Sequence, residues 1–143
     1  MEKIIGMNEQ IKKQLEESVT TIQAVVADSN IIHRVQQASR LTASAIKSGH
    51  KLMVAGNGGS VADAQHTVAE FVSRLTVDRP AMRAVALTTD TSILIATGNA
   101  YSYDKVFERQ VEALGQKDDV LLVISPSGNS RSPLSGTSAV TAV

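Results

Sequence analysis

The sequence predicts an α/β fold, a three-layer, doubly wound parallel sheet preceded by a long N-terminal helix. Short apolar runs at 52–55, 84–87 and 120–124 have the length and composition of buried strands. Segments with helical spacing of apolar residues separate these runs. Strands that alternate with helices imply parallel pairing through right-handed crossovers, with helices on both faces of the sheet.

Two helices are expected before the first strand. Residues 8–27 place apolar side chains at helical spacing, and Asp28-Ser29-Asn30 interrupts the pattern. A second helical pattern runs from Ile31 to Ile46 and is closed by Gly49. Such a long first helix has little of its own domain to cover, so it either packs against a partner subunit or caps the sheet.

The first strand leads into a glycine-rich loop, Gly56-Asn57-Gly58-Gly59-Ser60, whose backbone can approach a ligand closely. Ser60 is expected to be the N-cap of the next helix, and the free N–H groups behind it would form an anion site. The loop lacks both the G-x-G-x-x-G pattern and a Walker lysine, so it predicts neither a dinucleotide fold nor a nucleotidase. The alternative is an ordinary glycine-rich turn between strand and helix.

The helix expected at 61–75 carries His66 and Glu70 on one face, because they are spaced i, i+4. The opposite face is apolar, with Val61, Ala64, Val68, Phe71, Val72 and Leu75. The pair is either a weak surface His–Glu contact, or two metal ligands, or a base and its partner one turn from the phosphate loop.

The remaining elements continue the alternation of strands and helices. Residues 88–92 offer an N-cap for a short helix before Gly98-Asn99, and a further helix is expected at 103–114, closed by Gly115. The inward residues of that helix are expected to be Val106, Phe107, Val111 and Leu114. The run at 120–124 is apolar throughout, which predicts a central strand.

A serine-rich loop, Ser125-Pro126-Ser127-Gly128-Asn129-Ser130, follows the third strand immediately. Its hydroxyl and backbone groups can donate to phosphate oxygens, and it lies at the carboxyl end of a strand, where open α/β sheets bind ligands. A serine-rich loop alone is weak evidence. Together with the loop that contains Asn57, it predicts a phosphate clamp.

Composition excludes several other functions. The chain has 143 residues, enough for one domain, and 14 basic and 14 acidic residues, so no general attraction to nucleic acid or an anionic membrane is expected. The absence of cysteine rules out disulfides and thiolate chemistry and leaves metal binding to histidine and carboxylates. No apolar run is long enough to span a membrane and no signal segment is present at the start, so a cytoplasmic location is expected.

These motifs resemble the sugar isomerase (SIS) family, and specifically phosphoheptose isomerase. The resemblance rests on five motifs in order, from about Lys12 to Ser130: Gly56 to Ser60, Asp63 to His66 with Ala69 to Phe71, Ala86 to Ser92, Gly98-Asn99, and Ser125 to Ser130. It implies the SIS fold with flavodoxin-like topology. It also implies a homotetramer that interconverts sedoheptulose 7-phosphate and D-glycero-D-manno-heptose 7-phosphate, for lipopolysaccharide or other surface-glycan precursors.

The resemblance also assigns roles to residues. Glu70 would be the catalytic base or a metal ligand, and His66 and Glu70 would hold one zinc ion. The residues implied to contact the substrate are Asn57, Gly58, Gly59, Ser60, His66, Glu70, Asn99, Ser125, Ser127 and Ser130.

The chain departs from the family pattern in three places. Pro126 removes one backbone N–H from the cradle, and Ala100 stands where the family has an aspartate. Residues 131–143 replace an expected helix with poor helix formers, and the family's later Gln and His have no counterpart. We therefore expect an SIS domain at 1–130, made of N-terminal helices at 8–48 and a core at 51–130. The 131–143 segment would be an atypical tail that is not native to the fold.

Two further interpretations remain open. One is a non-enzymatic SIS module that binds a sugar phosphate or a protein partner such as the bacterial replication initiator. The presence of Ala100 in place of an aspartate favours this interpretation. The other is a fragment without independent function, which the tail favours. The presence of both His66 and Glu70 favours the isomerase, because a pure binding module does not need that pair.

Overall fold

Three parallel strands form the centre of the fold in a computed structural model, which describes residues 2–136. They are β1 (Leu52–Gly56), β2 (Ala84–Ala86) and β3 (Val120–Ile124), in the order β2-β1-β3. Met53 of β1 pairs with Val85 on one side and with Leu121 on the other. The doubly wound parallel sheet expected from the sequence is confirmed.

The helices are α1 (Glu2–Ala27), α2 (Ser29–Lys47), α3 (Ser60–Val72), α4 (Thr91–Ala100), the 3₁₀ turn η1 (Tyr103–Lys105), α5 (Glu108–Leu114) and α6 (Arg131–Ser135). The chain divides into two units, Met1–Arg40 and Leu41–Val143, and the sheet belongs to the second. The predicted long first helix is confirmed, and it begins earlier than expected. The break after it is an N-cap, because Asp28 Oδ1 accepts the N–H groups of Asn30 and Ile31 at 2.8 and 3.3 Å.

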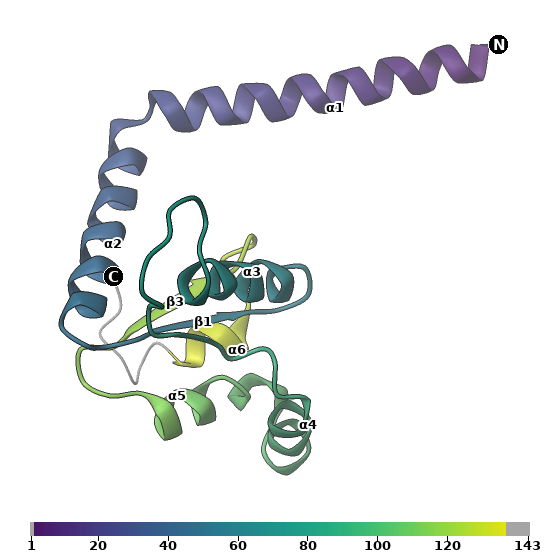
Figure 1. Cartoon of the computed structure of the whole chain (residues 1–143). Coiled ribbons are helices and arrows are strands. Elements are labelled where there is room, and N and C mark those ends of the chain that lie inside the picture. Colours follow the sequence, from purple (N-terminus) through teal and green to yellow (C-terminus); the bar gives the residue numbers. More distant parts are fainter. Residues whose placement is uncertain (1, 137–143) are drawn as a thin grey trace. The chain divides into compact units, whose positions relative to one another are not determined.

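All residues of β1 are buried, and their side chains alternate between the two faces of the sheet. The three layers follow because each face is covered by different elements. Leu52 and Val54 face α3, where they pack with Ala64 and have Val68 and Phe71 beside them. Met53 and Ala55 face the other way and pack with Leu87, Val106, Phe107 and Val111. Figure 1 shows the result, with α3 on one face of the sheet and α5 and α6 on the other.

The expectation that 120–124 is the central strand is wrong. In the part of the chain that the structure describes, β3 pairs with β1 alone, and Leu122 is 41% exposed. The central strand is β1, which pairs on both sides. An unbroken apolar run indicates burial, but it does not say how many neighbours a strand has.

The helix expected at 61–75 is shorter, because α3 ends at Val72. Arg79 ends it by donating from its guanidinium to the carbonyls of Phe71 and Glu70, at 2.9 and 2.5 Å. A cation at this point also suits the negative end of the helix dipole. Leu75, expected in the core, lies beyond the end of the helix and is exposed, and Val72, the last residue of the helix, is exposed as well.

The segment expected as one helix at 103–114 is split into η1 and α5. Val106, Phe107 and Val111 are buried as predicted, but Leu114, in the last turn of α5, is exposed. Helix α4 is longer than expected and continues through Asn99, with Asp90 as its N-cap accepting from the Ile93 N–H at 2.9 Å.

The expectation of no helix after Ser130 is wrong for Arg131–Ser135, which forms α6. Pro133 lies in its first turn, where its missing N–H would have no helical partner in any case. Ser132 and Pro133 are buried, and α6 contacts η1, α5 and β3. The rest of the predicted tail, 137–143, lies outside the described residues.

A buried carboxylate joins the starts of β1 and β3. Asp119, 4% exposed, accepts the N–H groups of Lys51 and Gln116, each at 2.8 Å, and forms an ion pair with the Lys51 ammonium. His50 Nδ1 lies 3.9 Å from Asp119 Oδ1. Burial acts to raise the pKa of Asp119, but the Lys51 ammonium and the two N–H donors outweigh it, so the pKa lies below its usual value.

Candidate functional site

The loops after β1 and β3 meet at the carboxyl edge of the sheet. The Asn57 side-chain nitrogen donates to Ser130 Oγ at 2.8 Å and to Ser132 Oγ at 2.7 Å, and the Tyr103 hydroxyl donates to Asn57 Oδ1 at 3.3 Å. The helices that follow these two strands cover opposite faces, α3 on one and α6 on the other. This position is the topological switch point, where doubly wound sheets bind ligands.

The loop after β1 is closely packed against α3. A Cβ atom on Gly56 would lie 2.8 Å from Ser60 Cβ and 2.8 Å from Ser60 O, so only glycine allows this approach. Gly58, with φ +56°, adopts the left-handed conformation that favours glycine.

The expectation that Ser60 is the N-cap is wrong. Gly59 occupies that position, and Ser60 is the buried first residue of α3. The N–H groups of Ser60, Val61 and Ala62 donate back to loop carbonyls three residues earlier, at 3.0, 3.2 and 3.1 Å. These bonds use donors that we expected to be free for an anion. The N–H groups of Gly58 and Gly59 have no acceptor among the described residues, so they remain available to a ligand.

The loop after β3 contains a buried hydroxyl, Ser125 Oγ, that has no hydrogen-bond partner among the described residues. A buried polar atom of this kind is uncommon and costs free energy unless a ligand satisfies it. A turn follows, in which the Gly128 N–H donates to Ser125 O at 3.0 Å and Ser127 Oγ accepts from the Asn129 N–H at 3.3 Å. Pro126 is the second residue of this turn, a position that favours proline.

His66 and Glu70 lie on one face of α3, with His66 Nε2 3.9 Å from Glu70 Oε1. The His66 side chain is 76% exposed and that of Glu70 is 29% exposed. The second carboxylate oxygen, Glu70 Oε2, is buried and has no hydrogen-bond partner in the described structure. This oxygen therefore has an unused acceptor position within the described structure.

A zinc ion fits these two side chains in part. An imidazole nitrogen and a carboxylate oxygen 3.9 Å apart can close on one ion at about 2.0–2.2 Å each, after a small side-chain adjustment. A structural or catalytic zinc takes at least three protein ligands. No group of three or more His, Cys, Asp or Glu side chains suited to a metal occurs within residues 2–136.

The other residues that we expected in the site are distributed as follows. Asn99 lies exposed in the last turn of α4, and within residues 2–136 no hydrogen bond or ion pair joins it to either loop. Sequence reasoning did not find Tyr103 or Ser132. Nothing in their local sequence signals a bond to Asn57, and Ser132 lies in a segment that we expected to be foreign to the fold.

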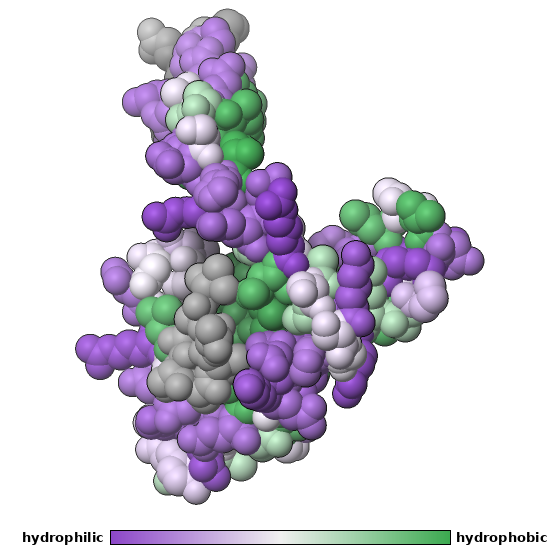
Figure 2. Space-filling view, turned by 90° about the vertical axis from the view of Figure 1, so that its left-hand side faces the viewer, coloured by the Kyte–Doolittle hydropathy of each residue, from purple (hydrophilic) through white to green (hydrophobic). Residues whose placement is uncertain are grey.

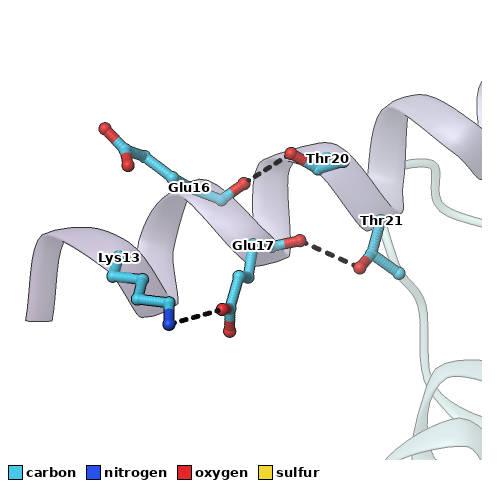
Figure 3. Close-up of a pocket in the computed structure, with 5 residues that line it drawn as sticks. All are labelled: Lys13, Glu16, Glu17, Thr20 and Thr21. Atoms are coloured by element: carbon cyan, nitrogen blue, oxygen red, sulfur yellow. Dashed lines mark hydrogen bonds and ion pairs between the residues drawn. The ribbon is translucent and has the colours of Figure 1, made fainter. Parts of the chain in front are cut away.

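Two surface hollows lie elsewhere and contain none of these residues. Figure 3 shows the first, lined by Lys13, Glu16, Glu17, Thr20 and Thr21 of α1 alone. Its threonine hydroxyls donate to carbonyls of the same helix at 2.9 Å, so its polar groups already have partners. The second, of about 340 Å³, lies between α4 and α5 and is mainly apolar.

The fold and the two loops together define a doubly wound α/β protein with a candidate ligand site at its switch point. A comparison with protein families assigns the chain to one of them. The model of the SIS domain matches residues 14–142. The chain belongs to the SIS domain family. Its helices within the described range include none that is both long enough and apolar enough to cross a membrane.

Within that family the chain is similar to phosphoheptose isomerases. It is 48% identical over 129 residues to phosphoheptose isomerase 2 of Campylobacter jejuni, covering 90% of this chain and 64% of that protein. It is 51% identical over 120 residues to the phosphoheptose isomerase of Burkholderia pseudomallei, covering 84% and 61%. The chain thus spans less than two thirds of the length of these relatives.

Two solved structures extend the similarity to the fold. Phosphoheptose isomerase GmhA from Neisseria gonorrhoeae superimposes with a TM-score of 0.85 at 39% identity, covering 93% of this chain and 68% of that one. A phosphoheptose isomerase from Francisella tularensis gives 0.83 at 35% identity, covering 92% and 68%. The SIS fold with flavodoxin-like strand order is therefore confirmed.

Proposed function

We propose that this protein acts as a phosphoheptose isomerase, interconverting sedoheptulose 7-phosphate and D-glycero-D-manno-heptose 7-phosphate in the supply of surface-glycan precursors. The observation that carries the proposal is the meeting of the loops after β1 and β3 at the switch point, where Ser125 Oγ is buried and has no hydrogen-bond partner among the described residues. Glu70 Oε2, on α3, is likewise buried without a partner in the described structure. The similarity to proteins named phosphoheptose isomerase supplies the substrate class.

The phosphate would be held by the two loops. The hydroxyls of Ser125, Ser127 and Ser130 and the N–H groups of Gly58 and Gly59 are donors, and phosphate oxygens accept hydrogen bonds. A phosphate held this way fixes the sugar chain relative to α3, which carries the carboxylate. Asn99 belongs to the site by resemblance alone.

The isomerisation moves a proton between two adjacent carbons. Glu70 would take the proton from the carbon beside the carbonyl and return it to the neighbouring carbon, since its Oε2 has no competing partner among the described residues. His66 and Glu70 would hold a zinc ion, which would supply a Lewis acid for the sugar oxygens. With two ligands in the described chain, that ion would be held weakly.

The second candidate is an SIS module that binds a sugar phosphate without turning it over. The small number of metal-ligating side chains and the presence of Ala100 favour it. Both candidates need the phosphate clamp, and a measurement of turnover separates them.

We expect Ser125→Ala to weaken binding of sedoheptulose 7-phosphate about tenfold or more, measured by isothermal titration calorimetry. A hydrogen bond to a charged group contributes about 1.5–3 kcal/mol, and about 1.4 kcal/mol is a factor of ten. Ser127→Ala should weaken binding as well. Ser39→Ala is the control, because the Ser39 hydroxyl bonds its own helix at Val35 O. Equal affinity in the wild type and both loop variants would remove the phosphate assignment.

We also propose that the protein is a homotetramer in which α1 packs against other subunits. The support is an exposed apolar stripe on α1 that includes Ile11, Leu15 and Ile22. Figure 2 shows apolar side chains, in green, at the surface between hydrophilic ones. Burying such a stripe in an interface removes apolar area from water.

Sedimentation velocity should show a large assembly for the wild type and smaller species for Leu15→Lys. Thr20→Lys, on the opposite side of the helix, should not change the assembly. A monomeric wild type at high concentration would contradict the proposal.

A further inference from the structure

All of the hydrogen-bonding directions of the Asn57 amide nitrogen are used within the chain. An amide nitrogen has two N–H donors, and here one goes to Ser130 Oγ and the other to Ser132 Oγ, at 2.8 and 2.7 Å. The amide oxygen accepts from the Tyr103 hydroxyl. The side-chain amide of Asn57 therefore has no N–H left for a ligand, although the family resemblance implies that this residue contacts the substrate.

These bonds require the hydroxyl oxygens of both serines to act as acceptors toward Asn57. An amide nitrogen only donates, so Ser130 Oγ must accept from it, and the hydroxyl proton of Ser130 is left to point elsewhere. Ser130 is half-buried and ends the same loop that holds the unpartnered Ser125. A phosphate oxygen needs a donor, and a Ser130 held in this way is a donor.

Tyr103 decides which end of the amide faces the serines. Its hydroxyl, on η1, donates to the amide oxygen, while the amide nitrogen donates to Ser130 and Ser132. If the amide were flipped, its oxygen would face Ser130. The Ser130 hydroxyl would then have to donate to that oxygen, and it could no longer donate to a phosphate. Ser132, 2% exposed, holds the second N–H and opposes the same rotation.

We propose that Tyr103 and Ser132 are positioning residues of the phosphate site, which act through Asn57 to hold the Ser130 hydroxyl as a hydrogen-bond donor to the phosphate of the ligand. This inference rests on the proposed function, because it takes the ligand to be a sugar phosphate. It assigns Asn57 an internal role and gives function to a residue of α6. It also joins three segments of the chain into one site: the loop after β1, η1 and the segment after β3.

Calorimetry with sedoheptulose 7-phosphate, and with inorganic phosphate as a second probe, tests the inference on the whole chain. We expect Tyr103→Phe and Ser132→Ala each to weaken binding of both probes about three- to tenfold, the range for loss of one neutral hydrogen bond. Tyr101→Phe is the matched control. Its ring is exposed and lies 5.1 Å from the Arg109 guanidinium, outside the site.

Two readouts separate positioning from a merely structural role. In an Asn57→Ala background, Tyr103→Phe should have no further effect on affinity, because Tyr103 acts through Asn57; independent destabilisation would add to the first loss. In nuclear magnetic resonance spectra, the two side-chain amide protons of Asn57 should shift in Tyr103→Phe and in Ser132→Ala, and stay unchanged in Tyr101→Phe. The spectra also keep the test decisive if Asn57→Ala does not fold.

The outcomes are distinct. If the wild type binds neither probe, the proposed function fails and this inference fails with it. If the wild type binds and Ser125→Ala weakens binding, but Tyr103→Phe and Ser132→Ala retain wild-type affinity, the inference alone is overturned. Weaker binding in both variants, together with shifted Asn57 amide resonances and no additional loss in the Asn57→Ala background, supports it.

Discussion

The 143-residue chain is expected to convert sedoheptulose 7-phosphate at least about 10²-fold more slowly than the Campylobacter jejuni relative in the same assay. Proton transfer between two carbons needs a base and a matched acid, each contributing about 10²–10⁴-fold. Glu70 supplies one of them, and within the described residues its ion-pair partner is His66 alone. Ala100 also stands where the resemblance implies an aspartate.

A coupled assay for heptose 7-phosphate, run with and without added zinc, makes this measurement. Added zinc should change the rate little, since two side chains hold the ion weakly. Turnover of about 1–10³ per second would contradict the expectation. Glu70→Gln would then show whether Glu70 is the base, because the variant keeps the shape of the side chain and loses its basicity. Failure to turn over in a chain that still binds sedoheptulose 7-phosphate would favour the binding module.

The second large effect is expected at Asp119, where Asp119→Ala should lower the free energy of unfolding by about 3–5 kcal/mol. Removing the carboxylate leaves the Lys51 ammonium, 16% exposed, without its partner, and leaves two N–H groups without an acceptor. Urea denaturation at pH 7 measures the change. Asp78→Ala is the control, because Asp78 is 91% exposed and its pair with Arg74 should contribute little. A loss below about 1 kcal/mol in Asp119→Ala would contradict the structural role of the carboxylate.

Asp119 should also make the fold sensitive to acid. Its pKa in the folded chain lies below the usual value of about 3.9, so the folded state binds the proton less readily than the unfolded state. The stabilisation is therefore complete above that usual pKa and is lost as the pH falls through the lowered one. Unfolding free energies measured from pH 7 to pH 2 should fall more steeply below about pH 4 in the wild type than in Asp119→Asn. Parallel curves would show that Asp119 does not contribute.

The strands could be predicted from sequence because their signal is local. The apolar runs at 52–55, 84–87 and 120–124 match β1, β2 and β3 to within one residue. Their order could not be predicted in the same way, since Leu122 is as apolar as the buried residues of β1 and yet is exposed at an edge. Whether an apolar side chain is covered depends on which segment lies beside it.

The ends of helices were harder to predict because distant groups decide them. Arg79, beyond the end of α3, takes the carbonyls that would otherwise continue the helix, and Leu75 is left outside. Helix α6 forms from a segment with low intrinsic propensity, since Ser132 and Pro133 are buried against neighbouring elements. Tertiary packing overrides propensity in both places.

The site was predictable in its parts and unpredictable in its connections. Both loops follow strand ends, so their meeting at one edge of the sheet follows from the fold. The bonds from Asn57 to Tyr103, Ser130 and Ser132 join residues far apart in the sequence, and no local pattern encodes them. The unpartnered oxygens of Ser125 and Glu70 likewise depend on burial, which only the folded chain provides.

The central place of β1 has a consequence for how the protein forms during synthesis. Leu52 pairs with Ala84 and with Val120, both of which are made after it. The helices need only nearby residues and can form early, but β1 has no neighbour until the later strands leave the ribosome. Non-local parallel pairings of this kind are slow to close, and apolar segments remain open to association meanwhile. A nascent chain that ends before Ile124 would therefore display an apolar strand without its full set of neighbours, which is the form of this protein that chaperones would encounter.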